Sequence, residues 1–251
     1  MMSKFFVSRD AIGEGSVRVT GEDVNHIKNV LRAAIGDEIT VCDGQGFDYA
    51  CVIAGIGKSE ITASYDVADD AVACDTEPSC RVTLYQGIAK GERMDQLIQK
   101  CVELGVYQIV PVVCARTVVR FSNDKDRVSK QERWQRIATE AAKQCNRGII
   151  PSVATPVDFK EVVAQPMEGV KFIPYEEERT VMIKDVLAGS AVAHAYGEVN
   201  FFIGPEGGFD CDEVKLAVVN GFTPVSLGKR ILRTETAGPA VMAVIGYELG
   251  F

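Results

Sequence analysis

The residues best suited to binding a ligand follow an apolar stretch at 199–203. After Ile203 the chain runs Gly204-Pro205-Glu206-Gly207-Gly208, and Asp210 then precedes a helix-like segment. Glycines at the end of a strand let the backbone approach a ligand, and open α/β sheets bind ligands at the carboxyl ends of their strands. The spacing matches neither GxGxxG nor GxxxxGK[ST], which argues against dinucleotide and P-loop sites. We therefore predict a ligand loop of another type, the alternative being a tight turn that needs glycine.

A second segment of this kind, LGKRILRTETA, spans residues 227–237. It again separates a predicted strand from a predicted helix, and it mixes three apolar side chains with three cations. Apolar walls with a few convergent polar groups are typical of small-molecule pockets. The alternative is a helix start with Thr234 or Thr236 as its cap, which can hold alongside ligand binding.

Basic residues are concentrated in the middle of the chain. Residues 79–147 hold 13 basic and 7 acidic side chains, whereas the whole chain carries a net charge of −8. Several of these cations stand at predicted strand or helix ends, where they are well placed for phosphate contacts: Lys90, Arg93, Arg116, Arg120, Lys143 and Arg147. An ordinary solvated helix face is the alternative.

Composition sets the broad class of the protein. The chain has 251 residues, of which 47% are hydrophobic and 25% are charged, and this balance is typical of a soluble globular protein with one large or two smaller domains. Its acidity argues against a protein that coats nucleic acid through bulk positive charge.

The cysteines and histidines indicate neither a metal centre nor a disulfide framework. The eight cysteines include no CxxC pair, and the two histidines, His26 and His194, are far apart in the sequence. No stretch resembles a signal-peptide core or a membrane span. We therefore expect reduced cysteines, no bound metal and a cytoplasmic location.

The pattern of elements predicts two domains. Short β-favouring runs at 17–20, 38–42 and 47–56, with a helix near 22–31, indicate a small β-barrel or sandwich over residues 1–72. An acidic segment ending in proline makes 73–79 a linker. From residue 80 to 251 strands alternate with helices, which predicts an α/β domain with a mostly parallel sheet. The expected strands are 81–86, 107–114, 171–175, 199–203 and 223–227, and the expected helices are 94–104, 131–147, 212–220 and 236–249.

Five segments, in this order, carry a resemblance to a known family. They are HIKNVLR at 26–32, KGERMDQLIQKCVELG at 90–105, RWQRIATEAAKQCNR at 133–147, IGPEGGF at 203–209 and LGKRILRTETA at 227–237. Together they resemble the SPOUT-class RsmE family of 16S ribosomal RNA uridine-N3 methyltransferases, and the match runs nearly end to end.

The resemblance implies a fold, a cofactor and an assembly. A PUA-like RNA-binding β-barrel would precede a SPOUT methyltransferase domain with a deep trefoil knot, and the protein would be a homodimer. The cofactor would be S-adenosylmethionine. The pocket carried over from the family comprises Tyr175, Glu176, Ile203, Gly204, Pro205, Glu206, Gly207, Gly208, Leu227, Gly228, Ile231, Leu232 and Thr234.

The resemblance also implies the reaction, which is methylation of N3 of a uridine in the decoding region of 16S rRNA in the small ribosomal subunit. Uracil N3 is a weak acid, so a base or nearby cations must favour its anion. From position alone we expect Arg233, Arg93 and Arg147 to stabilise uracil or phosphate. Glu206 or Glu235 would then be the base.

Two alternatives come from other classes of protein. A non-catalytic RNA-binding or assembly factor on the same fold would be favoured by loss of the glycines at 204, 207, 208 or 228, yet all four are present. A nucleotide-phosphate hydrolase or transferase would need a Lys, Ser or Thr in the 204–208 turn and a set of metal-binding carboxylates, and neither is visible.

Overall fold

The computed structural model describes residues 4–67, 71–188 and 197–251, so His194 lies outside the described residues. The chain forms two compact units. Unit 1 comprises Met1–Glu77 and Ala142–Ile150, and unit 2 comprises Pro78–Ala141 and Pro151–Phe251. Residues 142–150, which we expected in the second domain, therefore group with the first.

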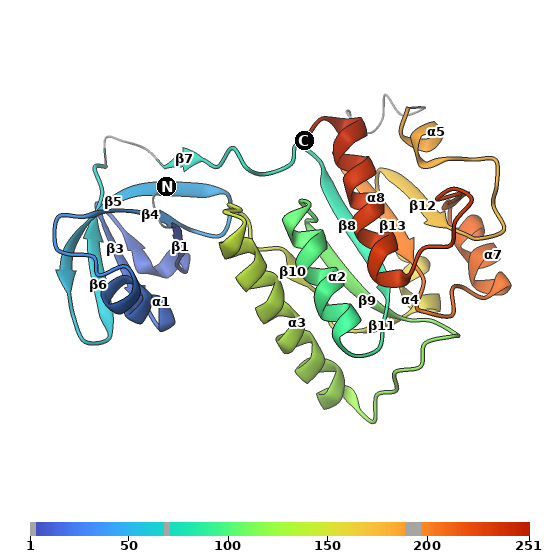
Figure 1. Cartoon of the computed structure of the whole chain (residues 1–251), viewed down its shortest axis with the longest axis horizontal. Coiled ribbons are helices and arrows are strands. Elements are labelled where there is room, and N and C mark those ends of the chain that lie inside the picture. Colours follow the sequence, from blue (N-terminus) through green and yellow to red (C-terminus); the bar gives the residue numbers. More distant parts are fainter. Residues whose placement is uncertain (1–3, 68–70, 189–196) are drawn as a thin grey trace. The chain divides into compact units, whose positions relative to one another are not determined.

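Unit 1 is built on one seven-stranded sheet, in the order β1-β4-β5-β6-β3-β2 with β7 paired to β5 (Figure 1). The β1–β4 pair is parallel and the other pairs are antiparallel. The strands are β1 (Lys4–Phe6), β2 (Ile12–Gly13), β3 (Ser16–Thr20), β4 (Glu38–Cys42), β5 (Phe47–Ile56), β6 (Glu60–Ser64) and β7 (Val72–Ala73). A short 3₁₀ turn, η1 (Arg9–Ala11), joins β1 to β2.

Alternating side chains build the core of unit 1. In β3 the apolar Val17 and Val19 are fully buried between exposed polar neighbours, which is the period of a half-buried strand. The expected helix at 22–31 forms as a short α-helix, α1 (Glu22–Asn25), followed by a π-helical turn, η2 (His26–Val30). The Leu31 amide donates to the His26 carbonyl at 2.9 Å, and Ile27 packs into the core.

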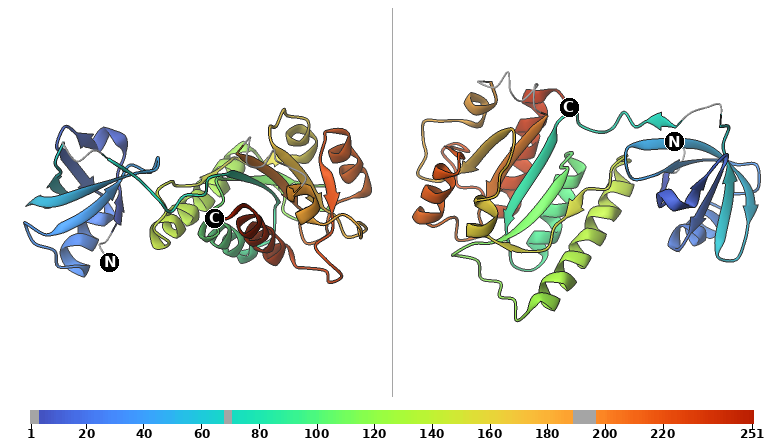
Figure 2. Two further views of the ribbon diagram at one scale, coloured as in Figure 1. Left: turned by 90° about the horizontal axis from the view of Figure 1, so that it is seen from above. Right: turned by 180° about the vertical axis from the view of Figure 1, so that it is seen from behind.

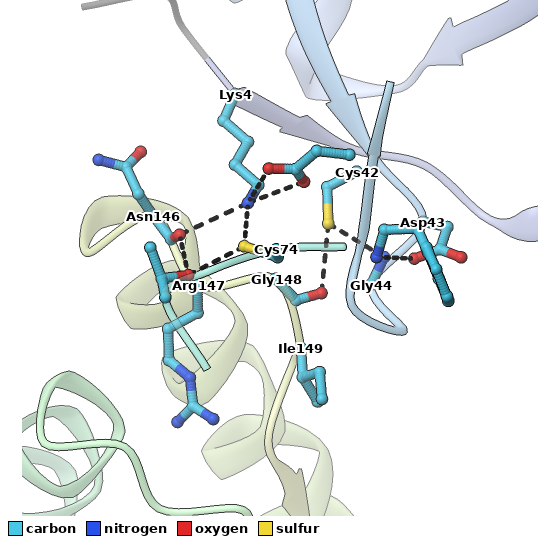
Figure 3. A network of polar contacts seen from close by, with 12 residues as sticks. Lys4, Cys42, Asp43, Gly44, Cys74, Asn146, Arg147, Gly148 and Ile149 are labelled. Atoms are coloured by element: carbon cyan, nitrogen blue, oxygen red, sulfur yellow. Dashed lines mark hydrogen bonds and ion pairs between the residues drawn. The ribbon is translucent and has the colours of Figure 1, made fainter. Parts of the chain in front are cut away.

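The segment at 142–150 is tied into unit 1 by polar contacts (Figure 3). The Lys4 ammonium donates to Asp48 at 2.9 Å, to the Cys74 sulfur at 3.3 Å and to the Asn146 carbonyl at 3.5 Å. The buried Cys42 thiol donates to the Gly148 carbonyl at 3.2 Å. These contacts explain why the end of the segment folds with strands that are distant in sequence.

Unit 2 contains the predicted parallel sheet, in the order β10-β9-β8-β13-β12-β14 with β11 paired to β9. All of its ladders are parallel. The strands are β8 (Arg81–Gly87), β9 (Gln108–Val113), β10 (Ser152–Val153), β11 (Val157–Asp158), β12 (Val170–Pro174), β13 (Glu198–Ile203) and β14 (Thr223–Val225). The α/β prediction is confirmed.

Helices cover both faces of this sheet. On one face α2 (Glu92–Glu103) and α8 (Thr234–Leu249) lie side by side (Figures 1 and 2). On the other, α4 (Phe159–Val163) and α7 (Cys211–Val219) enclose an aromatic core that includes Phe202 and Phe222. In the described part of unit 2 the other helices are α3 (Asp124–Gln144) and α5 (Ile183–Ala188). α3 starts earlier and ends earlier than the predicted 131–147.

Within the described ranges no helix is long and apolar enough to cross a membrane. All eight cysteines are free thiols. Over residues 4–67, 71–188 and 197–251, no three His, Cys, Asp or Glu side chains gather as a metal site would require.

Candidate active site

Three loops at the carboxyl ends of neighbouring strands enclose a cavity of about 1000 Å³ in unit 2. They follow β12, β13 and β14, which share one edge of the sheet because their ladders are parallel. The lining residues are Pro174, Tyr175, Glu176, Glu178, Arg179, Met182, Ile203, Gly204, Pro205, Glu206, Gly208, Phe209, Ser226, Leu227, Gly228, Lys229, Arg230, Ile231, Leu232, Arg233, Thr234 and Ala237.

The loop after β13 is a tight turn followed by a capped helix. The Gly208 amide donates to the Pro205 carbonyl at 2.9 Å, and Gly208 has a φ of +67°, a conformation that side chains disfavour. Asp210 caps α7, and its own amide donates to Glu213 at 2.9 Å, which completes the predicted capping box. Glu213 is buried and also accepts from the Ala115 amide at 2.7 Å. The turn is therefore fixed both to its own helix and to the end of β9.

The loop after β14 presents apolar and cationic side chains before α8 begins. Ile231 is 89% exposed, and Lys229, Arg230 and Arg233 are exposed as well. The first residue of α8, Thr234, is buried and donates from its hydroxyl to the Gly204 carbonyl at 2.7 Å. The two loops predicted from sequence are thus joined directly.

The loop after β12 forms the third wall. Glu178 accepts from the Thr180 hydroxyl at 2.6 Å and from the amides of residues 179–181. The Thr180 hydroxyl and these amides hold the pKa of the Glu178 carboxyl at about 2. The Ser226 amide donates to the Val181 carbonyl at 2.8 Å, which ties this wall to β14.

An ion-pair chain lies beside the cavity. Glu206 accepts from the Lys90 amide at 2.8 Å and from the Arg93 guanidinium at 2.9 Å, and the same guanidinium lies 3.8 Å from Glu235. Burial would raise the pKa of Glu206, but the bonds from Lys90 and Arg93 outweigh it and lower the pKa below its ordinary value. Glu206 is therefore a stable anion and a weak base.

A second arginine supports the turn from outside the cavity. Arg116 donates to the Gly207 carbonyl at 3.0 Å and lies 3.5 Å from the Asp210 carboxylate. We had expected it to face phosphate, but in the structure its guanidinium is directed at the β13 loop.

The structure brings most of the predicted residues together. Of the 13 predicted cofactor residues all except Gly207 line the cavity. Among the predicted catalytic residues, Arg233 and Glu206 line it, and Arg93 and Glu235 reach it through the ion-pair chain.

Arg147 does not line the cavity, and it belongs to unit 1. It is 4% exposed, and its guanidinium donates to Glu77 at 2.6 Å (the Arg147 side chain is drawn in Figure 3). Glu77 also accepts from the amides of Gly148 and Ile149, at 2.7 and 3.1 Å. The predicted contact with uracil or phosphate would require breaking this buried pair, so we assign Arg147 a structural role.

Other lining residues were absent from the predicted site. Arg179, Met182 and Ser226 come from the loop after β12 and the end of β14. No spacing motif marks them, and only the expectation that parallel strand ends share an edge could have indicated them.

The basic block is largely neutralised by the fold. Seven of its 13 cations form ion pairs with carboxylates: Arg93, Lys100, Arg116, Arg127, Arg133, Lys143 and Arg147. These seven side chains therefore face carboxylates of this chain. Three exposed cations outside the block, Lys229, Arg230 and Arg233, lie at the cavity on the loop before α8.

Known proteins share both the sequence and this fold. An RNA methyltransferase domain model matches residues 76–246, and an RNA methyltransferase PUA domain model matches residues 19–64. The ribosomal RNA small subunit methyltransferase E of Bacillus subtilis is 31% identical over 98% of this chain and 97% of its own length. The chain belongs to the ribosomal RNA small subunit methyltransferase E family.

Further members of the methyltransferase E family agree. The Synechocystis protein is 33% identical over 98% of this chain and 77% of its own length. The Neisseria gonorrhoeae methyltransferase E, solved with bound S-adenosyl methionine, has a TM-score of 0.84 and 33% identity, and the alignment covers 98% of both chains. The predicted family, the PUA-like first domain and the enzyme class are thus confirmed. The present protein is a ribosomal RNA methyltransferase.

Proposed function

We propose that this protein transfers a methyl group from S-adenosylmethionine to N3 of a uridine in the decoding region of 16S rRNA within the small ribosomal subunit. The observation that carries the proposal is the cavity formed by the three loops after β12, β13 and β14. Its two main loops are those that the sequence indicated, and the related Neisseria enzyme was solved with this cofactor.

The side chains and backbone of the cavity fit such a cofactor. Leu227, Ile231, Leu232 and Met182 supply apolar walls, as an adenine ring requires. Backbone groups of Gly204 and Gly228 stand among them with no side chain in the way. We propose that these residues hold the adenosine part.

The bound cofactor would supply a methyl group activated by its sulfonium, because the neutral thioether that remains is a good leaving group. The protein's own task is then to position the uracil and to favour its N3 anion. Arg233 is the predicted catalytic cation that lines the cavity, so we propose that it stabilises this anion. Glu206 and Glu235 would orient Arg93 between them.

The two carboxylates differ in their suitability as the base. Glu206 already accepts two hydrogen bonds and has a lowered pKa. The Glu235 Oε2 atom is buried and accepts no hydrogen bond from any residue in the described ranges. Glu235 does not line the cavity, however, so we propose that Arg233 favours the N3 anion and that the N3 proton passes to solvent rather than to either carboxylate.

We further propose that the rRNA is bound through the exposed cations at the cavity. Lys229, Arg230 and Arg233 lie on one loop, and no ion pair holds them within the described part of the chain. Such a small cluster suits a local contact with phosphates and predicts a shallow salt dependence of binding.

The homodimer stays a prediction. Exposed apolar side chains on α8 support it. Tyr247 is 86% exposed and Val244 is 37% exposed on this helix, so the helix presents apolar surface to solvent. A solution mass equal to one chain would contradict the dimer. The trefoil knot likewise stays a prediction from the family resemblance.

Two measurements test the proposed function. Calorimetric titration with S-adenosylmethionine should show saturable binding, and no heat at millimolar cofactor would refute the proposal. Tritiated methyl groups should pass to undermethylated small subunits, with mass mapping of the product. Label on a guanosine or a 2′-hydroxyl would refute the N3 assignment alone.

Replacing Arg233 by alanine should lower kcat for methyl transfer about 100-fold, because one cation that stabilises developing charge is removed from the site. The cofactor Kd should stay within about twofold, since Thr234 and the apolar walls are untouched. The matched control is Arg136→Ala, an exposed cation on α3, which should behave as wild type. Near-normal turnover by Arg233→Ala would remove this residue from the mechanism.

A further inference from the structure

The buried side-chain amide of Gln86, on β8, links the loops after β13 and β14, which line the proposed cofactor site. Gln86 stands near the end of β8, directly opposite Ile203 of β13 in the ladder, and none of its surface is exposed. Its Nε2 atom donates to the Gly87 carbonyl at 2.8 Å and to the Thr234 hydroxyl at 2.9 Å. That hydroxyl donates in turn to the Gly204 carbonyl.

The direction of this hydrogen-bond chain is fixed by its two ends. The Gly87 and Gly204 carbonyls can only accept, so the Gln86 atom facing Gly87 must be the NH₂ nitrogen. That nitrogen also faces Thr234, whose oxygen must accept from it. The single hydroxyl proton is then left for Gly204.

Burying this amide is unfavourable unless its polar atoms are hydrogen-bonded. Its Oε1 atom has no hydrogen-bond partner among the residues that the structure describes. A Cβ built at Gly238 would lie 3.6 Å from this oxygen, 3.4 Å from Leu97 and 3.5 Å from the Cys101 sulfur, so an apolar side chain and a buried thiol lie close to it. An apolar residue would suit packing better, so the amide must serve another purpose.

We propose that Gln86 is a positioning residue for cofactor binding, which it supports by orienting the Thr234 hydroxyl toward Gly204. This inference rests on the proposed function, because the two loops that it joins line the proposed S-adenosylmethionine site. Gly204 opens the loop after β13, and Thr234 opens α8 directly after Arg233. Without the amide, the hydroxyl is free to turn, and the loops lose their fixed separation.

The test is a double-mutant cycle on cofactor affinity. Gln86→Met keeps the shape and removes the donor, and Thr234→Val removes the hydroxyl. Each should raise the Kd for S-adenosylmethionine about tenfold, and the double variant should be no weaker than Thr234→Val, because Gln86 acts through that hydroxyl. Thr234→Ser, which restores the hydroxyl, should bind within about twofold of wild type.

A matched control and a second readout separate this inference from the proposed function. Gln135→Met alters another hydrogen-bonded glutamine, on α3 and outside the cavity, and should leave the Kd unchanged. Amide exchange in the cofactor-free protein should speed up at residues 204–208 and in the first turn of α8 in Gln86→Met, and not in Gln135→Met. A wild-type protein that binds no cofactor refutes the proposed function. Unchanged Kd and exchange in Gln86→Met, or fully additive effects in the cycle, refute the role of Gln86.

Discussion

Replacing Gly87 by alanine should weaken S-adenosylmethionine binding at least about 100-fold. A Cβ atom there would lie 2.5 Å from the Pro205 nitrogen and 2.8 Å from the Gly204 carbonyl carbon. These are backbone atoms of the loop after β13, so the clash cannot be relieved by turning a side chain. Overpacking of this kind also lowers the free energy of unfolding by about 1–3 kcal/mol.

Titration calorimetry and urea unfolding would measure the two effects of Gly87→Ala. The control is Gly238→Ala, because a Cβ on α8 would meet its neighbours only at 3.4 Å and beyond, which is ordinary contact. Gly238→Ala should bind cofactor like wild type. If Gly87→Ala also bound normally, the close approach of β8 to the loop would not matter for the site.

The second large effect is expected at the buried ion pair of unit 1. Glu77→Ala should lower the free energy of unfolding by about 3–5 kcal/mol, because it removes a largely buried carboxylate that accepts from the Arg147 guanidinium and from the amides of Gly148 and Ile149. The side chains are only 4% and 12% exposed, so water cannot replace the lost carboxylate. Denaturant unfolding of the full chain measures the loss.

Arg147→Ala should lower stability similarly while leaving kcat per folded molecule unchanged. That result would separate a structural arginine from one that contacts substrate. The control is Lys215→Ala, whose partner Asp212 is 86% exposed, and it should change stability by less than about 1 kcal/mol. A large fall in kcat for folded Arg147→Ala would restore it to the site.

The same pair predicts a pH dependence of stability. Burial would raise the pKa of Glu77, but Arg147 and the amides of residues 148–149 outweigh it, so the pKa in the folded state lies below 4.5. A carboxyl whose pKa is lower in the folded state stabilises the fold at pH values above its pKa in the unfolded state. This stabilisation is lost as the pH falls through the pKa of the folded state. The unfolding free energy should therefore drop as the pH falls below about 4.5, and less steeply in Glu77→Gln.

Local signals predicted most of the residues that line the cavity, and long-range pairs account for the residues that they missed. Glycine spacing and the mixture of apolar and basic residues indicated the loops after β13 and β14, because those features act within a few residues. Gln86 and Thr234 are 148 positions apart, so no spacing rule joins them. Arg147 was misjudged for the same reason, since its partner is 70 positions away.

The predicted helix boundaries differ from the observed ones where the local geometry or the sequence departs from the regular α-helical period. The π-helical turn at His26–Val30 adds a residue to the helical turn, which the apolar pattern of 22–31 does not reveal. In α3 the first turns are almost wholly polar, so the apolar stripe that we used begins only near Gln131.

The grouping of residues 142–150 with the first unit has a consequence for synthesis on the ribosome. The chain passes between the units at 77–78, 141–142 and 150–151, so neither unit is one continuous stretch. While only the first 77 residues have emerged, Glu77 lacks Arg147 and the amides that neutralise it. The amino-terminal unit can therefore complete its fold only after residue 150 has left the exit tunnel.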